Sequence, residues 1–161
     1  CYVIFGEEEK MIDLKGLKSI IQLNYLNDFM LEKLIRITDI IEYKKGDYIF
    51  KEGDDAKIIY AVIDGKIGLE MEKNSSTRIL IDKIIQGMML GFSALVDTED
   101  KSYTTSARVL TDTRLYAWKA EDLEAIFSQD YEMGFLFIKR IAKIVKARLQ
   151  IRNIQFLDIY K

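Results

Sequence analysis

The sequence predicts a mainly β domain that is flanked by helices at both ends. Three observations predict this class: short β-rich runs between residues 37 and 119, turn-forming residues between those runs, and helical patterns on either side. Strands that recur at intervals of roughly 8–12 residues are typical of a sandwich, a jelly roll or a barrel. We therefore divide the chain into an N-terminal helical segment (1–36), a β-rich segment (37–119) and C-terminal helices (120–161).

The N-terminal segment has a helical pattern with polar edges over residues 7–36. Asn27 has the side chain of a helix N-cap, because its amide oxygen can accept a hydrogen bond from a backbone N–H of the first turn. Phe29, Leu31 and Leu34 follow it at helical spacing. We expect these three residues to supply the apolar contacts of this helix.

Seven β-rich runs make up the middle of the chain. They are Ile37–Tyr43, Asp47–Lys51, Ile58–Ile63, Lys66–Glu72, Arg78–Ile84, Tyr103–Val109 and Thr113–Trp118. Residues that favour turns separate these runs, and the recurrent one is glycine, at Gly46, Gly53, Gly65 and Gly87. Glycine adopts positive φ without steric cost, so each of these positions is expected to lie in a tight turn.

Helical patterns return at Ala120–Ser128 and continue from Tyr131 to Tyr160. The longer helix has two neighbouring apolar stripes, which together are too wide for one packing partner. The first stripe has the 4-3 spacing of a coiled coil. Its predicted role is a homodimer interface formed by Ile138, Ala142, Val145, Leu149 and Phe156. The second stripe, expected to cover the β-rich segment, contains Phe137, Ile141, Ile144, Arg148 and Ile151. The alternative is that both stripes cover the core of a monomer.

The composition excludes several classes of function. The chain has no histidine, the commonest general base and zinc ligand, so we expect no enzyme, no catalytic residue, no metal and no cofactor. Its net charge is −2, whereas a DNA-reading chain usually has a basic surplus, so nucleic-acid binding through this chain alone is not expected. No apolar run reaches the ~18–20 residues that span a bilayer. A single cysteine forms no internal disulfide, so we expect a cytoplasmic location and no membrane contact.

The glycine spacing carries a resemblance to a known family. Residues Lys45–Ala56 and Ile59–Ile67 resemble the opening of a CRP/FNR-type cyclic nucleotide-binding domain, in which glycines occupy the turns of the roll. Leu90–Leu95 and Tyr103–Val109 fall where that family has its phosphate-binding cassette. The resemblance extends over nearly the whole chain. It implies a double-stranded β-helix (jelly roll), so that residues 37–119 form a β-roll with a cassette.

The cassette lacks the two charged side chains that the resemblance implies. In the family, a glycine and the amides after it hold the cyclic phosphate, the next residue is a glutamate that binds the ribose, and an arginine neutralises the phosphate. Here the glutamate position holds Phe92 and the arginine position holds Tyr103. These two aromatic residues either line a remodelled pocket or fill it. The pocket candidates from the cassette are Gly91, Phe92, Ser93, Ala94, Leu95, Tyr103, Thr104 and Thr105.

Arg148 and Arg152 complete the set of pocket candidates. Each interrupts an apolar stripe of the long helix, and they share one face because they lie four residues apart. The resemblance implies that this helix lies against the mouth of the roll. We expect the two arginines to face the cassette and to meet either a small anionic ligand with an apolar part or acidic residues of a partner chain. The alternative is that both side chains reach water across apolar surface.

These observations leave three functions open. The first is a ligand-sensing or regulatory domain in signal transduction, which does not bind cyclic AMP or cyclic GMP by the usual contacts and responds to a small anion or a protein partner. The second is the sensor half of a CRP/FNR-type transcription regulator whose helix-turn-helix is absent from this chain. The third is a tethering domain of a longer membrane or signalling protein.

Overall fold

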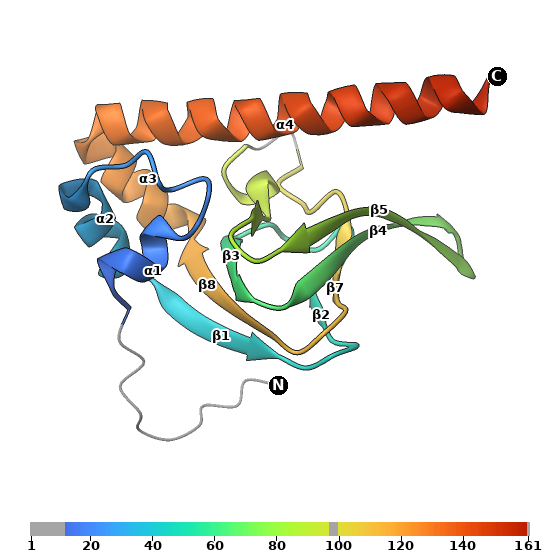
Figure 1. The fold of residues 1–161 in the computed structure, drawn as a ribbon, viewed down its shortest axis with the longest axis horizontal. Helices are drawn as coiled ribbons and strands as arrows, with labels where there is room; N and C mark the ends of the chain where they lie inside the picture. The colour runs from blue at the N-terminus through green and yellow to red at the C-terminus, as the bar shows by residue number, and fades with distance from the viewer. Residues whose placement is uncertain (1–11, 97–99, 161) are drawn as a thin grey trace.

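Two four-stranded antiparallel sheets form a roll at the centre of the computed structural model, which describes residues 12–96 and 100–160 (Figure 1). The strand orders are β1-β8-β3-β6 and β2-β7-β4-β5. The strands are β1 (Asp39–Tyr43), β2 (Tyr48–Phe50), β3 (Ile58–Asp64), β4 (Lys66–Asn74), β5 (Thr77–Ile85), β6 (Met89–Leu90), β7 (Ser106–Val109) and β8 (Thr113–Lys119). The predicted mainly β class with flanking helices is confirmed.

The helices lie at one end of the roll and along one side of it. They are α1 (Leu14–Lys18), α2 (Asp28–Ile35), the short 3₁₀ helix η1 (Phe92–Ala94), α3 (Ala120–Gln129) and α4 (Tyr131–Ile159). Figure 1 shows α1, α2 and α3 gathered at the same end, while α4 runs past the roll and continues beside the β4–β5 hairpin. The roll and α4 therefore face each other over a long stretch of the molecule.

All seven predicted β-rich runs form strands, with bounds that differ by a few residues. The glycine turns are also confirmed, because Gly46, Gly53, Gly65 and Gly87 have φ values of 95°, 88°, 108° and 84°. Strand β6 was not predicted. It has only two residues, which is too short for an alternating pattern, and it is defined by its pairing with Tyr60 and Ala61 of β3.

The helical pattern over residues 7–36 is only partly confirmed. Residues 7–11 lie outside the described part of the chain, and the remainder contains two short helices, α1 and α2, joined by turns. The segment between them is held on the roll, because the backbone N–H of Ile21 donates to the carbonyl of Gly87 at 2.8 Å. This contact with the turn before β6 keeps the chain from continuing as one helix.

Asn27 caps α2 as predicted, since its side-chain oxygen accepts a hydrogen bond from the backbone N–H of Met30 at 2.9 Å. Leu31 and Leu34 are buried, also as predicted. The expectation for Phe29 was wrong, because this side chain is 66% exposed and Met30 takes the third buried position. The face of α2 that meets the core is rotated relative to the one inferred from spacing.

Two buried hydrogen bonds that share the Thr38 hydroxyl join α2 to strand β8 of the first sheet. The indole N–H of Trp118 on β8 donates to the hydroxyl of Thr38 at 2.7 Å, and that hydroxyl donates to the carbonyl of Leu34 at 2.6 Å. Trp118 and Thr38 are both buried, so neither polar group can turn to water instead. The pair fixes the end of the roll on which α2 and α3 rest.

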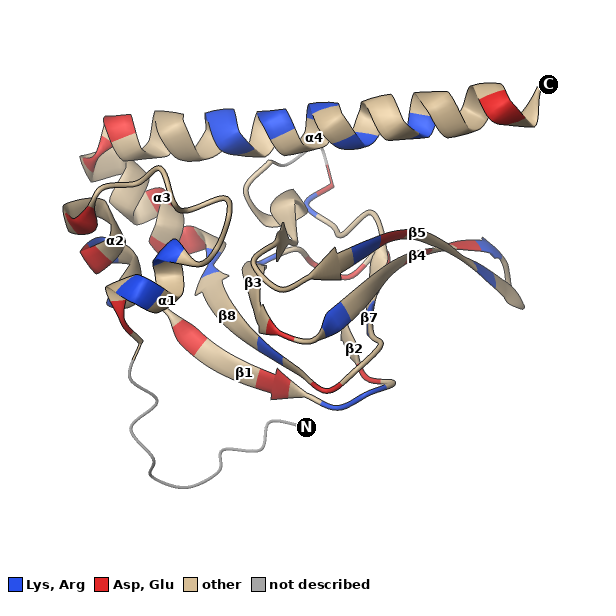
Figure 2. Ribbon diagram, in the orientation of Figure 1, with Lys and Arg blue, Asp and Glu red and all other residues tan. Residues whose placement is uncertain are grey.

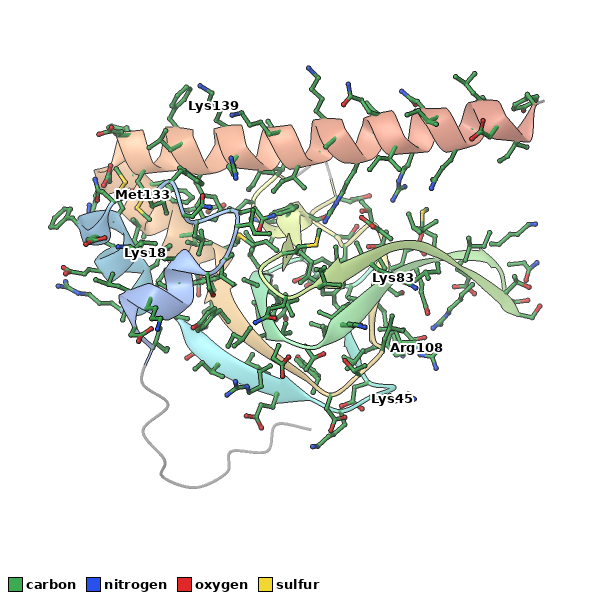
Figure 3. The ribbon with its side chains drawn as sticks, viewed as in Figure 1. Lys18, Lys45, Lys83, Arg108, Met133 and Lys139 are labelled. Carbon is green, nitrogen blue, oxygen red and sulfur yellow. The ribbon has the colours of Figure 1, made fainter. Side chains whose placement is uncertain are left out.

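The first half of α4 is packed against the rest of the domain. Asp130 caps it, with a carboxylate that accepts from the N–H of Met133 and pairs with Lys33 of α2 at 2.7 Å. Met133 lies among the side chains of α2 and α3, whereas Lys139 points away from the roll (Figure 3). Gly134 permits close packing of the two last helices, because a Cβ there would lie 2.9 Å from Phe127 on α3.

The second half of α4 is exposed. Phe137 and Ile141 of the second stripe are buried against the roll, as predicted, but Ile151 of the same stripe is 56% exposed. The expectation that Ile151 covers the β-rich segment was wrong, because the helix extends beyond the part of the roll that could cover it (Figure 1). Within residues 12–96 and 100–160, no helix is both long and apolar enough to cross a membrane.

Candidate pocket between the roll and α4

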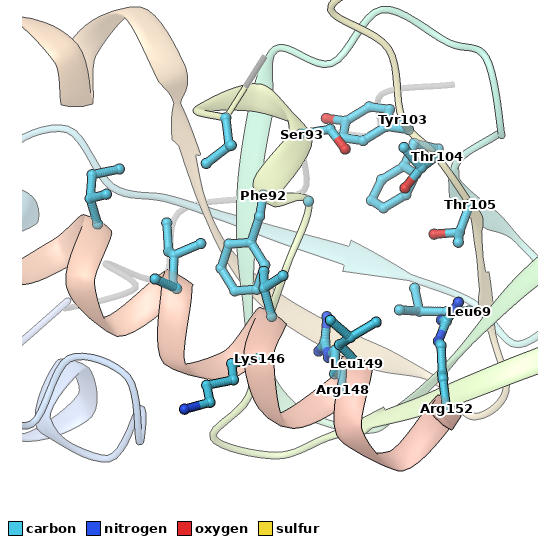
Figure 4. Close-up of a pocket in the computed structure, with 17 residues that line it drawn as sticks. Leu69, Phe92, Ser93, Tyr103, Thr104, Thr105, Lys146, Arg148, Leu149 and Arg152 are labelled. Carbon is cyan, nitrogen blue, oxygen red and sulfur yellow. The ribbon is translucent and has the colours of Figure 1, made fainter. Parts of the chain in front are cut away.

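A cavity of about 780 Å³ lies between the cassette, the interior of the roll and the exposed half of α4 (Figure 4). Its volume is within the range of roughly 300–1,000 Å³ that is usual for small-molecule sites. Six cassette candidates line it: Gly91, Phe92, Ser93, Tyr103, Thr104 and Thr105. Two others, Ala94 and Leu95, do not, since Ala94 is fully buried and Leu95 packs against the core.

The turn at Gly91 positions Phe92 and Ser93 at the cavity. Gly91 has φ of +87°, and a Cβ there would lie 2.8 Å from the carbonyl oxygen of Ile58. A side chain at this position would therefore meet both backbone strain and a backbone atom. The amides of Ala94 and Leu95 donate to the carbonyls of Gly91 and Phe92, so they are used within η1.

Tyr103 occupies the position of the cassette arginine, and its side chain points into the roll. Its ring is stacked on Phe50 with 3.8 Å between ring centroids and an interplanar angle of 13°. Its hydroxyl donates to the carbonyl of Ile58 at 2.7 Å and accepts from the N–H of Ile58 at 3.2 Å. Burial raises the pKa of this hydroxyl above its ordinary value, although its hydrogen bonds with Ile58 oppose the shift. The wall of the cavity here is therefore aromatic and neutral.

Arg148 is half-buried at the edge of the cavity. Its Nε atom lies 3.3 Å from a carboxylate oxygen of Asp82 on β5, and its guanidinium carbon lies 5.8 Å from the centroid of the Phe92 ring. Burial lowers the pKa of the guanidinium, and the Asp82 carboxylate raises it. An anionic ligand or a carboxylate of a partner chain was expected at Arg148, whereas the structure pairs Arg148 with a carboxylate of the same chain.

Arg152 also lines the cavity. In Figure 4 its side chain extends from α4 toward Leu69 and Thr105. Among the residues that the structure describes, Arg152 has no ion pair. Arg148 is therefore partly buried against the cassette, whereas Arg152 lines the cavity but is exposed to solvent.

The predicted dimer stripe and the cavity overlap. Four of its five residues, Ile138, Ala142, Val145 and Leu149, line the cavity, and only Phe156 lies beyond it. The other lining residues were not predicted to belong to the pocket: Phe50, Leu69, Val96, Ile141 and Lys146. Alternation along a strand could have placed the first two inside the roll, but no local signal shows which interior residues remain uncovered.

The charges around the cavity come from one side. Figure 2 shows Lys and Arg residues along the middle of α4, and Arg148, Arg152 and Lys146 are the cavity residues among them. No carboxylate belongs to the lining in the described ranges. The described residues also contain no group of three or more His, Cys, Asp or Glu that could hold a metal ion. The cavity can therefore accept an anion with an apolar part.

Comparisons with known proteins give a consistent result. A sequence model of the family described as "Cyclic nucleotide-binding domain" matches residues 40–130, which is more than half of the chain. The cAMP-dependent protein kinase regulatory subunit of Dictyostelium discoideum is 32% identical over 75 residues, which cover 47% of this chain. The chain spans only 22% of that relative's length.

Two solved structures have the same fold. The putative cyclic nucleotide-binding protein from Geobacter metallireducens GS-15 superposes with a TM-score of 0.75 and 24% identity, over 86% of this chain and 99% of the other. The regulatory subunit of a cAMP-independent protein kinase A from Trypanosoma brucei superposes with a TM-score of 0.67 and 15% identity, over 81% and 46% of the two chains.

Proposed function

The chain belongs to the family of cyclic nucleotide-binding domains, and on this premise we propose that it is a ligand-sensing regulatory domain that does not bind cyclic AMP or cyclic GMP by the usual contacts. The observation that carries the proposal is the position of Tyr103, whose ring is buried on Phe50 and whose hydroxyl is bonded to the Ile58 backbone. The regulatory role is supported by the name of the Dictyostelium discoideum relative. The Trypanosoma brucei subunit, from a kinase called cAMP-independent, has the same fold.

The missing contacts are large enough to matter. A charge-assisted contact to phosphate is worth about 1.5–3 kcal/mol, and Tyr103 offers no charge in its place. Phe92 likewise cannot accept a hydrogen bond from a ribose hydroxyl. Losing both contacts corresponds to a loss of roughly a hundred- to ten-thousandfold in affinity. A micromolar site would then become a millimolar one.

Calorimetric titration with cyclic AMP and cyclic GMP tests this proposal. We expect no saturable binding of either nucleotide below about 100 μM. A dissociation constant near 1 μM would contradict it, because such affinity requires contacts that Phe92 and Tyr103 cannot supply. The intrinsic fluorescence of Trp118, the single tryptophan, provides an independent check that the protein in the titration is folded.

We also propose that the domain is a homodimer whose interface is the exposed stripe of α4. Ile138, Val145, Leu149 and Phe156 are 42%, 52%, 57% and 58% exposed, although they follow a coiled-coil spacing. A second copy is the occupant that fits, because the same stripe on two helices is self-complementary about a two-fold axis. The unsupported end of a long helix also gains stability from such packing.

Two further parts of the proposal rest on composition. A non-enzymatic role is supported by the absence of histidine from the sequence and by a cavity whose only ionisable lining groups, among the described residues, are two arginines, a lysine and the buried hydroxyl of Tyr103. A cytoplasmic location is supported by the single cysteine, which suits a reducing compartment.

A further inference from the structure

The charged side chains of the cavity lie on the side opposite to the cassette, whereas the family resemblance would place them in the cassette. All of its positive charges come from α4, and the cassette side contributes only hydroxyl groups, a glycine and aromatic rings. Arg148 and Arg152 lie one turn apart and both line the cavity. The charged part of a ligand would therefore meet the long helix rather than the cassette loop.

The guanidinium of Arg148 has hydrogen-bond donors that are not paired within the chain's described residues. Its Nε side is used by Asp82, but its Nη2 atom is buried and has no hydrogen-bond partner among the described residues. A buried donor without an acceptor is unfavourable, and a guanidinium presents its N–H groups as a planar fork that fits a carboxylate. The exposed fraction of the Arg148 side chain is 22%, but Nη2 is not part of that exposed surface, so a small shift of the side chain is needed for an acceptor in the cavity to reach it.

The charge balance restricts the ligand to a single negative charge. Arg148 and Arg152 contribute two positive charges and Asp82 one negative charge, which leaves one positive charge where the two arginines line the cavity; the third lining cation, Lys146, points away from them in Figure 4. A phosphate monoester carries nearly two negative charges at neutral pH and would be left partly unbalanced. A carboxylate is matched, and the hydroxyl of Thr105 lies on the same side of the cavity as Arg152 (Figure 4).

The remaining lining determines the other half of the ligand. Phe50, Leu69, Val145 and Leu149 present carbon atoms to the cavity, and the ring of Phe92 covers Arg148. The lining hydroxyl groups, those of Ser93, Thr104 and Thr105 and the bonded one of Tyr103, all lie on the cassette side. We propose that the cavity binds an amphipathic carboxylate, with its carboxylate on Arg148 and Arg152 and its apolar part between α4 and the interior of the roll.

This inference rests on the proposed function and names the ligand class of the same cavity. It is tested by calorimetric titration of the full chain with decanoate and with 4-phenylbutanoate, one aliphatic and one aromatic carboxylate, and with 1-decanol as the neutral match of decanoate. We expect at least one carboxylate to bind with a dissociation constant below about 100 μM. We expect 1-decanol to bind at least about tenfold more weakly than decanoate if decanoate is the one that binds, since it lacks the charge.

Two variants with opposite expected effects sharpen the test. Arg148→Met removes the guanidinium but keeps an unbranched apolar stem, and it should weaken carboxylate binding at least about tenfold. Asp82→Asn frees the guanidinium and should strengthen carboxylate binding several-fold. Lys143→Met removes a positive charge from an exposed position of α4 outside the cavity and should change nothing. Unchanged affinity in Arg148→Met, or weaker binding in Asp82→Asn, would overturn the proposal.

The outcomes separate this inference from the proposed function. If neither carboxylate binds and cyclic AMP does not bind either, the ligand class is wrong but the absence of the usual cyclic nucleotide contacts stands. If cyclic AMP binds near 1 μM, the proposed function itself fails. Decanol binding as tightly as decanoate would show an apolar cavity that does not recognise charge, and would also overturn the inference.

Discussion

Removing one oxygen atom from Tyr103 tests whether this side chain is a fixed part of the roll. In Tyr103→Phe the ring can keep its stacking on Phe50, but the two hydrogen bonds with the backbone of Ile58, at 2.7 and 3.2 Å, are lost. Because Tyr103 is buried and both bonds are partly buried, water replaces the lost hydroxyl poorly. We expect the free energy of unfolding to fall by about 1–3 kcal/mol.

Urea denaturation followed by the fluorescence of Trp118 measures this change. The matched control is Tyr131→Phe, which removes the same atom from a side chain that is 80% exposed and should alter the stability by less than about 0.5 kcal/mol. A loss within about 0.3 kcal/mol of zero for Tyr103→Phe would refute the reasoning. The hydroxyl would then not hold the ring in place, and Tyr103 could leave the position of the cassette arginine.

Three other predictions concern stability and assembly. Thr38→Val should cost about 1–3 kcal/mol in chemical denaturation, because it leaves the Trp118 indole unpaired, whereas Thr38→Ser should cost less. Val145→Glu should dissociate the proposed dimer in light scattering while Lys143→Glu, outside the stripe, should not; a wild-type monomer at about 100 μM would contradict the interface. The Lys33 ammonium, through its hydrogen bond, lowers the pKa of the Asp130 carboxyl in the folded protein. The ionised carboxylate therefore stabilises the fold at pH values above the pKa of the unfolded chain, and this stabilisation is lost as the pH falls through the lower pKa of the folded protein. The stability advantage of the wild type over Asp130→Asn should be at most about 1 kcal/mol near pH 6, since the pair is partly exposed, and should shrink progressively as the pH falls below about 4; an advantage that does not change with pH would refute it.

The sequence predicted the fold well because its signals are local. Glycines such as Gly46 and Gly65 stand where the chain adopts positive φ, and the β-branched runs between them are typical of strands. β6 escaped prediction because two residues carry no periodicity. Phe29 was placed on the wrong face because spacing defines a stripe on a helix without showing which side of that stripe meets the core.

The part of the candidate site that local sequence signals define was predictable as well. Phe92 and Tyr103 could be located from the cassette spacing, and Arg148 from its place in an apolar stripe. The pairing of Arg148 with Asp82 could not be predicted from the sequence, since the two residues meet only through the packing of α4 on the β4–β5 hairpin. The stacking of Tyr103 on Phe50 is likewise a tertiary contact, between β2 and the segment that leads into β7.

The most direct test of the absence of the usual cyclic nucleotide contacts is a titration followed by amide NMR. We expect the backbone amides of Gly91, Phe92, Ser93, Thr104 and Thr105 to keep their chemical shifts as cyclic AMP is raised to about 100 μM, because neither a glutamate nor an arginine is present to hold it. Arg148 and Arg152 side-chain signals should stay unchanged in the same spectra. Shifts of the cassette amides that saturate at a dissociation constant near 1 μM would contradict the proposal, because they would place a tightly bound nucleotide in the cassette despite Tyr103.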